Sequence, residues 1–238
     1  MQDEILKHTK KIHETMKDQK HSFGEKLKEV IVEILIIVFA VTLSIWLHSW
    51  SEHKHEQKEV TEFLEDLKVD LKSDIKDLEK QNSYLNITSK KCNLFKSLTK
   101  SRIDSILQLK AENKIYLNLN PISKIRNTGN YEGFLSSGKI GLIEKRHLKN
   151  KILNYYQKIV PEKDEWQIYY NSLVFEMARE DINFTTYETF LKSVYASKKV
   201  KRIFGNCELQ AEQMVRINNT VIKNAKQILT EIDKETKI

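Results

Sequence analysis

The chain has 238 residues and a formal net charge of +7, with only six glycines and two prolines. So few turn-forming residues exclude a fold of many short strands and tight turns, and the abundance of Lys, Glu, Leu, Ile and Asn predicts an all-α protein with long helices. The positive charge is spread over many segments, which is typical of solvated helix faces, so we expect no nucleic-acid partner.

The first 29 residues form a polar, lysine-rich segment whose apolar residues recur at helical spacing. This pattern predicts an amphipathic helix that leads into the apolar stretch that follows. The segment is too long for the charged start of a usual signal peptide, and no small-x-small cleavage site follows Trp46. We therefore expect the apolar stretch to be retained as an anchor.

Residues 30–50, from Val30 to Trp50, are predominantly apolar. As a helix with a rise of about 1.5 Å per residue they extend about 31 Å, which matches a hydrocarbon core of roughly 30 Å. The stretch predicts a single transmembrane helix, so the lipid bilayer is the first expected partner. The alternative is a buried helix of a soluble protein, but few core helices are apolar on all sides over this length.

One face of the predicted span is smaller and more polar than the rest. It is formed by Glu33, Ile37, Ala40, Ser44 and His48, which follow one another at intervals of three or four residues. In lipid, helices associate through small residues and polar contacts, and an intramembrane carboxylate usually faces inward. We expect this face to be the contact of a parallel homo-oligomer. The alternatives are an ion-conducting pore along the face and a monomer whose Ala40 and Ser44 face lipid.

Lysines are unequally distributed around the span: six lie within the 20 residues before it and three within the 20 residues after it. Because Lys and Arg accumulate on the cytoplasmic side, this asymmetry predicts that residues 1–29 are cytoplasmic and that residues 51–238 form an extracytoplasmic domain. In a cell with an outer membrane, that domain lies in the periplasm.

After the span, one apolar residue recurs every seven positions. The seam consists of Leu64, Leu71, Leu78, Leu85 and Cys92. This spacing predicts that the transmembrane helix continues outward as a long stalk helix, with a break at Asn82–Ser83 or Asn86. The seam either extends the homo-oligomer contact beyond the membrane or is covered by helices of the same domain.

The rest of the chain shows helical apolar patterns and no strand-like alternation, so we expect five or six antiparallel helices packed as a bundle beside the stalk. A short helix with Ile103 and Ile106 precedes a break at residues 118–121. Turn-forming residues separate the later segments, which we expect at 131–135, at 143–160 before Pro161, at 166–177, at 184–194, and from Gly205–Asn206 to Ile232.

Residues 133–139 (GFLSSGK) spell most of a phosphate-binding loop. Ile140 stands where such a loop has the Ser or Thr that binds magnesium, and no buried strand precedes it, so we expect no bound nucleotide. In a structural turn, Gly138 would adopt a left-handed helix cap and Gly141 would permit close packing. We therefore assign a structural turn to Ser136, Ser137, Gly138 and Gly141.

Three further groups have ambiguous patterns. His48, Glu52, His55 and Glu59 share a helix face, but one helix cannot surround an ion, so we expect a solvated face and no metal. The basic cluster 198–202 fits either an anionic lipid or polymer, or the C-terminal end of a helix. The two cysteines, Cys92 and Cys207, are either joined outside the cytoplasm or, as the position of Cys92 on the seam favours, small buried side chains.

Three stretches together resemble one known family. The stretches are Glu62 to Leu71, Tyr131 to Ile143, and Leu148 with Tyr155 and Tyr156. They are similar to an uncharacterised, domain-of-unknown-function family of single-span, N-terminally anchored helical proteins found mainly in Bacteroidota. The likeness covers roughly residues 25–160. It implies an anchor in a bacterial inner membrane and a helical periplasmic domain, and it implies no activity.

No segment pairs a nucleophile with a base, sets two carboxylates in a recognisable motif or forms a glycine-rich cofactor loop. We therefore expect no catalytic residues and no cofactor. The sequence is best interpreted as a membrane-anchored scaffold or sensor that acts through self-association or by binding an envelope protein. The alternatives are a subunit of a homo-oligomeric channel and an enzyme with an unrecognised helical active site.

Overall fold

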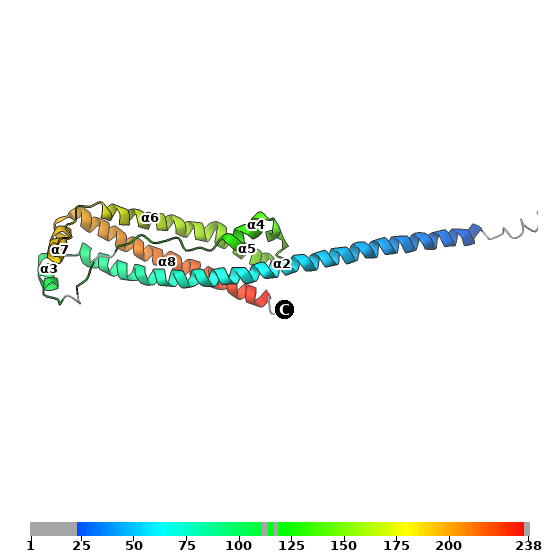
Figure 1. The fold of residues 1–238 in the computed structure, drawn as a ribbon, viewed down its shortest axis with the longest axis horizontal. Coiled ribbons are helices and arrows are strands. Elements are labelled where there is room, and N and C mark those ends of the chain that lie inside the picture. Colours follow the sequence, from blue (N-terminus) through cyan, green and yellow to red (C-terminus); the bar gives the residue numbers. More distant parts are fainter. Residues whose placement is uncertain (1–22, 111–113, 117–118, 236–238) are drawn as a thin grey trace, which may run out of the picture. The chain divides into compact units, whose positions relative to one another are not determined.

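The computed structural model describes residues 23–110, 114–116 and 119–235, and every regular element in these residues is a helix (Figure 1). The predicted all-α class is confirmed, while most of the amphipathic segment predicted at 1–29 lies outside the described residues. The elements are α2 (Phe23–Lys96), α3 (Lys100–Leu107), α4 (Gly129–Ser136), the 3-10 turn η2 (Lys139–Leu142), α5 (Arg146–Asn154), the π turn η3 (Tyr155–Ile159), α6 (Val160–Ala178), α7 (Tyr187–Ala196) and α8 (Lys198–Glu235).

The chain divides into two units, residues 1–56 and 57–238. Within the first unit, α2 contains one stretch that is long and apolar enough to cross a membrane, as a membrane anchor or a signal sequence would be. The side chains from Val30 to Trp50 are all exposed. The helix of a soluble core would bury such side chains, so this stretch does not have the character of a core helix.

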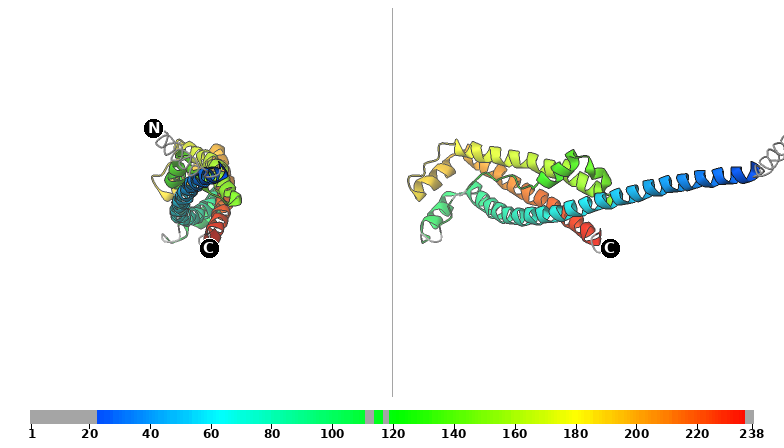
Figure 2. Two further views of the ribbon diagram at one scale, coloured as in Figure 1. Left: turned by 90° about the vertical axis from the view of Figure 1, so that its right-hand side faces the viewer. Right: turned by 45° about the vertical axis from the view of Figure 1, so that its right-hand side comes forward.

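Within the second unit, α2 and α8 pack side by side in opposite directions (Figure 2). Polar pairs across the interface show the antiparallel register, because each step forward along α2 is matched by an equal step back along α8. The pairs are Lys68–Asp233, Asn82–Asn219, Ser89–Glu212 and Asn93–Glu208. The predicted seam is confirmed as buried, since Leu64, Leu71, Leu78, Leu85 and Cys92 are each at most 1% exposed. The protein's own helices cover this seam, so it is not a surface for self-association.

The break predicted at Asn82–Ser83 or Asn86 is wrong, because α2 continues to Lys96. Asn82 instead faces α8, where the fully buried Asn218 donates hydrogen bonds to Asn82 Oδ1 (2.9 Å) and to Gln81 Oε1 (3.0 Å). A buried polar contact between apolar layers costs stability and specifies the register of two helices. These polar residues therefore align α2 with α8 and do not interrupt α2.

An extended segment, residues 119–128, runs between α2 and α6. Its residues belong to no helix or strand, and before Thr128 O, which accepts from the Glu132 N–H, its backbone has no such partner. A buried peptide group needs a hydrogen-bond partner. Side chains of the two helices provide these hydrogen bonds: Gln81 to Ser123 O (3.2 Å), Lys163 to Ile125 O (3.1 Å), Gln167 and Asn171 to Ile122 O (both 3.0 Å), and Asp74 from the Asn127 N–H (3.1 Å). The segment runs antiparallel to both helices, so α6 is parallel to α2 and the predicted all-antiparallel bundle is corrected.

Two further predicted helix ends are wrong. Pro161 lies inside a continuous helical run from Arg146 to Ala178, because the π turn η3 precedes it and the Val160 N–H bonds to Tyr155 O. The wider π turn relieves the clash between a proline ring and the carbonyl four residues earlier. Gly205 lies inside α8, where burial of Phe204 and Cys207 outweighs the roughly 1 kcal/mol that a helical glycine costs.

Candidate binding groove

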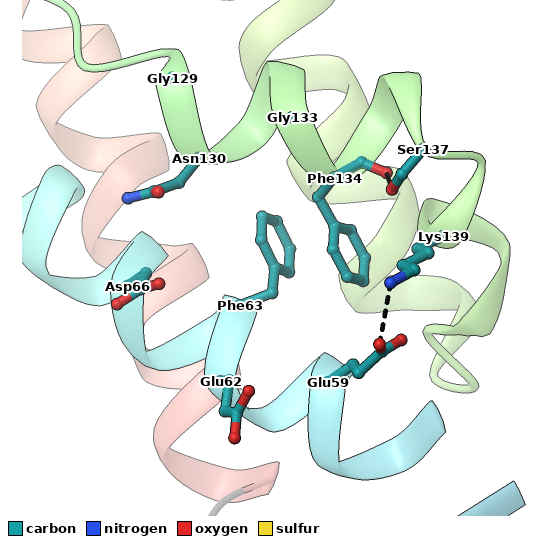
Figure 3. Close-up of a pocket in the computed structure, with 10 residues that line it drawn as sticks. All are labelled: Glu59, Glu62, Phe63, Asp66, Gly129, Asn130, Gly133, Phe134, Ser137 and Lys139. Carbon is teal, nitrogen blue, oxygen red and sulfur yellow. Dashed lines mark hydrogen bonds and ion pairs between the residues drawn. The ribbon is translucent and has the colours of Figure 1, made fainter. Parts of the chain in front are cut away.

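A groove of about 460 Å³ lies between α2 and the α4–η2 segment of the second unit (Figure 3). The phenyl rings of Phe63 from α2 and Phe134 from α4 stack in it, with centroids 4.0 Å apart and planes 3° from parallel. Both side chains are at most 9% exposed, so they join the groove to the hydrophobic core. The stacked pair holds the two helices together and gives the groove an apolar lining.

The α2 wall of the groove carries three carboxylates, Glu59, Glu62 and Asp66. They lie three and four residues apart, which places them on one side of the helix. Lys139 is the single lysine in the lining, and its Nζ lies 2.8 Å from Glu59 Oε1 at one end of the groove. The exposed Lys58 approaches Glu62 no closer than 3.7 Å. The lining therefore carries a net negative charge.

The α4 wall of the groove has no side chains at two positions, Gly129 and Gly133, which lie four residues apart. Apart from the two adjacent residues and the backbone of its own helix, a Cβ atom built on either would meet no atom within 4 Å. Neither has a positive φ, since Gly138 is the only described residue that does. Neither a left-handed turn nor close packing within the chain therefore requires glycine at these positions. The two glycines leave the helix backbone open to the groove.

Polar contacts hold α4 against α2. Asn130 Nδ2 donates to Asp70 Oδ2 (2.9 Å), and just before α4 the Asn127 side chain donates to Asp74 Oδ1 (2.7 Å). Asp74 is only 2% exposed, and this burial raises its pKa, although the hydrogen bonds from Asn127 act in the opposite direction. The buried carboxylate thus fixes the entry into α4 and, with it, one wall of the groove.

The predicted turn follows α4 directly. Ser136 is the last residue of α4, Ser137 is its C-cap, and Gly138 has a left-handed φ of 75°. Gly141 lies in η2, and a Cβ atom there would meet nothing within 4 Å, so the close packing predicted for it is wrong. It is exposed, while Leu142 and Ile143 make the contacts with the core. The GFLSSGK stretch is therefore a helix and a turn, with Lys139 paired to Glu59, and not a loop around phosphates.

The other candidate residues do not join this groove. The proposed oligomer face of the span is exposed within the first unit, and its use in association stays a prediction; it comprises Glu33, Ile37, Ala40, Ser44 and His48. Among the described residues, no three His, Cys, Asp or Glu side chains are gathered as a metal site requires. Cys92 and Cys207 are free thiols, and both are fully buried.

The basic cluster 198–202 lies at the N-terminus of α8, so its predicted place at the C-terminal end of a helix is wrong. Lys199 pairs with Glu180 (2.6 Å), and Lys201 donates to Leu98 O (2.9 Å) and lies over the Tyr195 ring. The Ser197 hydroxyl accepts a hydrogen bond from the Val200 N–H and caps the helix. A helix N-terminus is unfavourable for cations because the helix dipole is positive there, and these local contacts stabilise Lys199 and Lys201 at that end.

Sequence reasoning missed the groove. The sequence does contain one signal of the groove: small residues recur every four positions along one helix face, at Gly129, Gly133 and Ser137. In comparisons with known proteins, no curated protein and no solved structure shows a significant match. A family described as a family of unknown function (DUF6090) matches residues 33–201, which include every residue of the groove. The match begins later than the likeness expected at 25–160 and extends past its end. The chain therefore belongs to the DUF6090 family of unknown function.

Proposed function

We propose that this protein is a non-enzymatic, membrane-anchored scaffold whose groove between α2 and α4 binds a basic segment of a partner envelope protein. In this proposal the span from Val30 to Trp50 anchors the chain in a bacterial inner membrane. The N-terminus is cytoplasmic and the second unit is periplasmic, which the lysine asymmetry around the span supports.

The observation that carries the proposal is Gly133. A glycine in the interior of a helix destabilises it by roughly 0.5–1 kcal/mol relative to alanine. At Gly133 no left-handed backbone and no crowded neighbour offsets that cost. Residues that break a local rule without benefit to the fold are expected at functional sites. At Gly133 the benefit is to function: the open helix backbone opposite three carboxylates leaves room for a ligand.

The lining of the groove indicates the chemistry of the ligand. Carboxylates at Glu62 and Asp66 favour Lys or Arg, and a guanidinium forms bidentate pairs with carboxylates. The apolar rings of Phe63 and Phe134 provide contacts for the methylene stem of such a side chain. A volume of about 460 Å³ accommodates one or two side chains of a segment and not a folded domain.

Self-association is the second part of the proposal and is assigned to the span. The seam of α2 beyond it is covered by α8, so a homo-oligomer would form through the face with Glu33, Ala40 and Ser44. Such an arrangement presents several grooves side by side, which raises the effective concentration of a scaffold for its partner.

Site-specific photocrosslinking in cells tests the proposal. A photoreactive residue replaces Ser137, which lines the groove, and a matched control replaces Ser101, an exposed serine on α3 at the other end of the second unit. We expect Ser137 and not Ser101 to crosslink to an envelope protein at a Lys- or Arg-rich segment, as mapped by mass spectrometry. Equal crosslinking at both positions, no crosslink at Ser137, or a crosslink only to another copy of the chain contradicts the proposal.

A further inference from the structure

The two cysteines of the chain meet in the core of the second unit. Cys92 lies on α2 and Cys207 on α8, both are 0% exposed, and they belong to one hydrophobic cluster that also contains Phe95 and Phe204. They are the only two cysteines in 238 residues. The fold has therefore brought together two side chains that are far apart in the chain.

The register of the two helices places the cysteines opposite each other. Phe95 lies three residues after Cys92 and Phe204 three residues before Cys207, which are equivalent positions on antiparallel helices, and their ring centroids are 5.3 Å apart. The Cys92 and Cys207 thiols lie close enough to affect each other, and their interaction together with burial raises the pKa of Cys92. Antiparallel helices alone do not produce such contact, because it requires both side chains to be on the facing sides.

Small side chains lie on one side of the cysteines, and Phe95 and Phe204 lie on the other side. One turn earlier on α2 lie the buried Thr88 and Ser89, and one turn later on α8 lies the fully buried Ala211. The distance between two packed helices depends on the side chains at their contact, and small residues permit a closer approach of the backbones. A disulfide needs such proximity, since its Cα atoms are usually about 4.4–6.8 Å apart.

We propose that Cys92 and Cys207 become joined by a disulfide bond that locks α2 to α8. The inference rests on the proposed function in one respect, the location of the second unit outside the cytoplasm, where disulfides persist. The oxidant is a protein disulfide donor. The thiolate of one cysteine attacks the donor disulfide and releases one donor sulfur. The other cysteine then attacks the mixed disulfide, so the new S–S bond forms, the donor leaves as a dithiol, and the two thiol protons pass to it.

Burial determines when this reaction occurs. Once α8 has packed on α2, neither sulfur is accessible, and a thiol whose pKa is raised is a poor nucleophile. The exchange must therefore take place during folding, before the core closes. After closure the same burial protects the bond from reducing agents.

Intact mass of the full chain tests the proposal. Cells are quenched in acid, all free thiols are alkylated in denaturant without a reducing agent, and the protein is purified in mild detergent. We expect no alkyl adduct and a mass about 2 Da below that of the dithiol, which corresponds to two lost hydrogens. The control Cys207→Ala leaves Cys92 without a partner and should carry one adduct. Two adducts on the unaltered chain overturn the proposal.

A separate arm distinguishes this failure from a failure of the proposed location. In a Cys92→Ala/Cys207→Ala chain, a reporter cysteine replaces the exposed Asn86, and intact cells are treated with a membrane-impermeant thiol reagent. If the reporter is labelled and the unaltered chain carries two adducts, the disulfide is overturned and the proposed location stands. An unlabelled reporter with no adducts supports the disulfide and contradicts the location. An unlabelled reporter with two adducts overturns both.

Discussion

Replacing Gly133 by alanine should stabilise the second unit, although glycine is the natural residue. Alanine in a helix interior is more favourable than glycine by roughly 0.5–1 kcal/mol, chiefly because an unfolded chain with alanine has less backbone conformational entropy to lose on folding. Apart from its two adjacent residues and its own helix backbone, the added methyl group at Gly133 would meet no atom within 4 Å, so no clash with another segment offsets this gain. For a domain of this size the midpoint of thermal unfolding should rise by about 1–4 °C.

Circular dichroism of the full chain in mild detergent measures this shift. The matched control is Gly138→Ala, because Gly138 also has open space around it but a left-handed φ of 75°. A non-glycine residue in that conformation costs about 1 kcal/mol or more, so the control should unfold at a lower temperature. If Gly133→Ala also unfolds at a lower temperature, then the open wall of the groove is not free space, and the reasoning about the site fails.

Three other predictions concern the contacts around the groove, the buried carboxylates and the span. Lys139→Ala should change the free energy of unfolding by less than about 1 kcal/mol, because its ion pair with Glu59 is partly exposed; a larger loss in urea titrations would contradict this. Burial raises the pKa of Asp74, so its contribution to stability is complete below its ordinary value of 3.8 and declines as the pH rises through the raised value. Burial also raises the pKa of Glu208, but hydrogen bonds from Asn93 and Lys96 outweigh it and the net pKa is lowered, so this contribution is present above 4.5 and is lost as the pH falls. The free energy of unfolding, measured in urea between pH 3 and 7, should therefore fall less at higher pH in Asp74→Asn and fall less at acid pH in Glu208→Gln. An unchanged pH dependence in both variants would refute the assignment. In the span, single cysteines at positions 37, 40 and 44 should crosslink more efficiently than those at 38 and 42, and equal yields on both faces would contradict the oligomer face.

The long-range periodicity of the chain was readable from the sequence, because burial imposes it. A seven-residue spacing of apolar side chains is useful only on a helix that faces another helix, and the seam from Leu64 to Cys92 is indeed buried. Local breaking signals were less reliable. Pro161, Gly205 and Asn82 all lie inside helices, since a π turn, core burial and a buried polar pair respectively outweigh the local preference.

The groove could not be predicted from the sequence, because it depends on which distant segments meet. Phe63 and Phe134 stack only because the extended segment 119–128 is held along α2 and delivers α4 to that helix. The hydrogen bonds that hold the segment come from side chains such as Gln81, Gln167 and Asn171, whose spacing follows no recognisable motif. Glu59 was grouped with His48 on a helix face, whereas its partner in the fold is Lys139.

In the proposed function the groove itself, and not another surface, holds the partner. Photocrosslinking from Ser137 in two variants tests it most directly, since Gly133→Ala adds one methyl group to an open wall while Gly133→Leu projects a side chain into the space opposite Glu62. The crosslink to a basic segment should persist in the alanine variant and be lost in the leucine variant, with both chains folded by circular dichroism. An undiminished crosslink in a folded Gly133→Leu chain would contradict the proposed function.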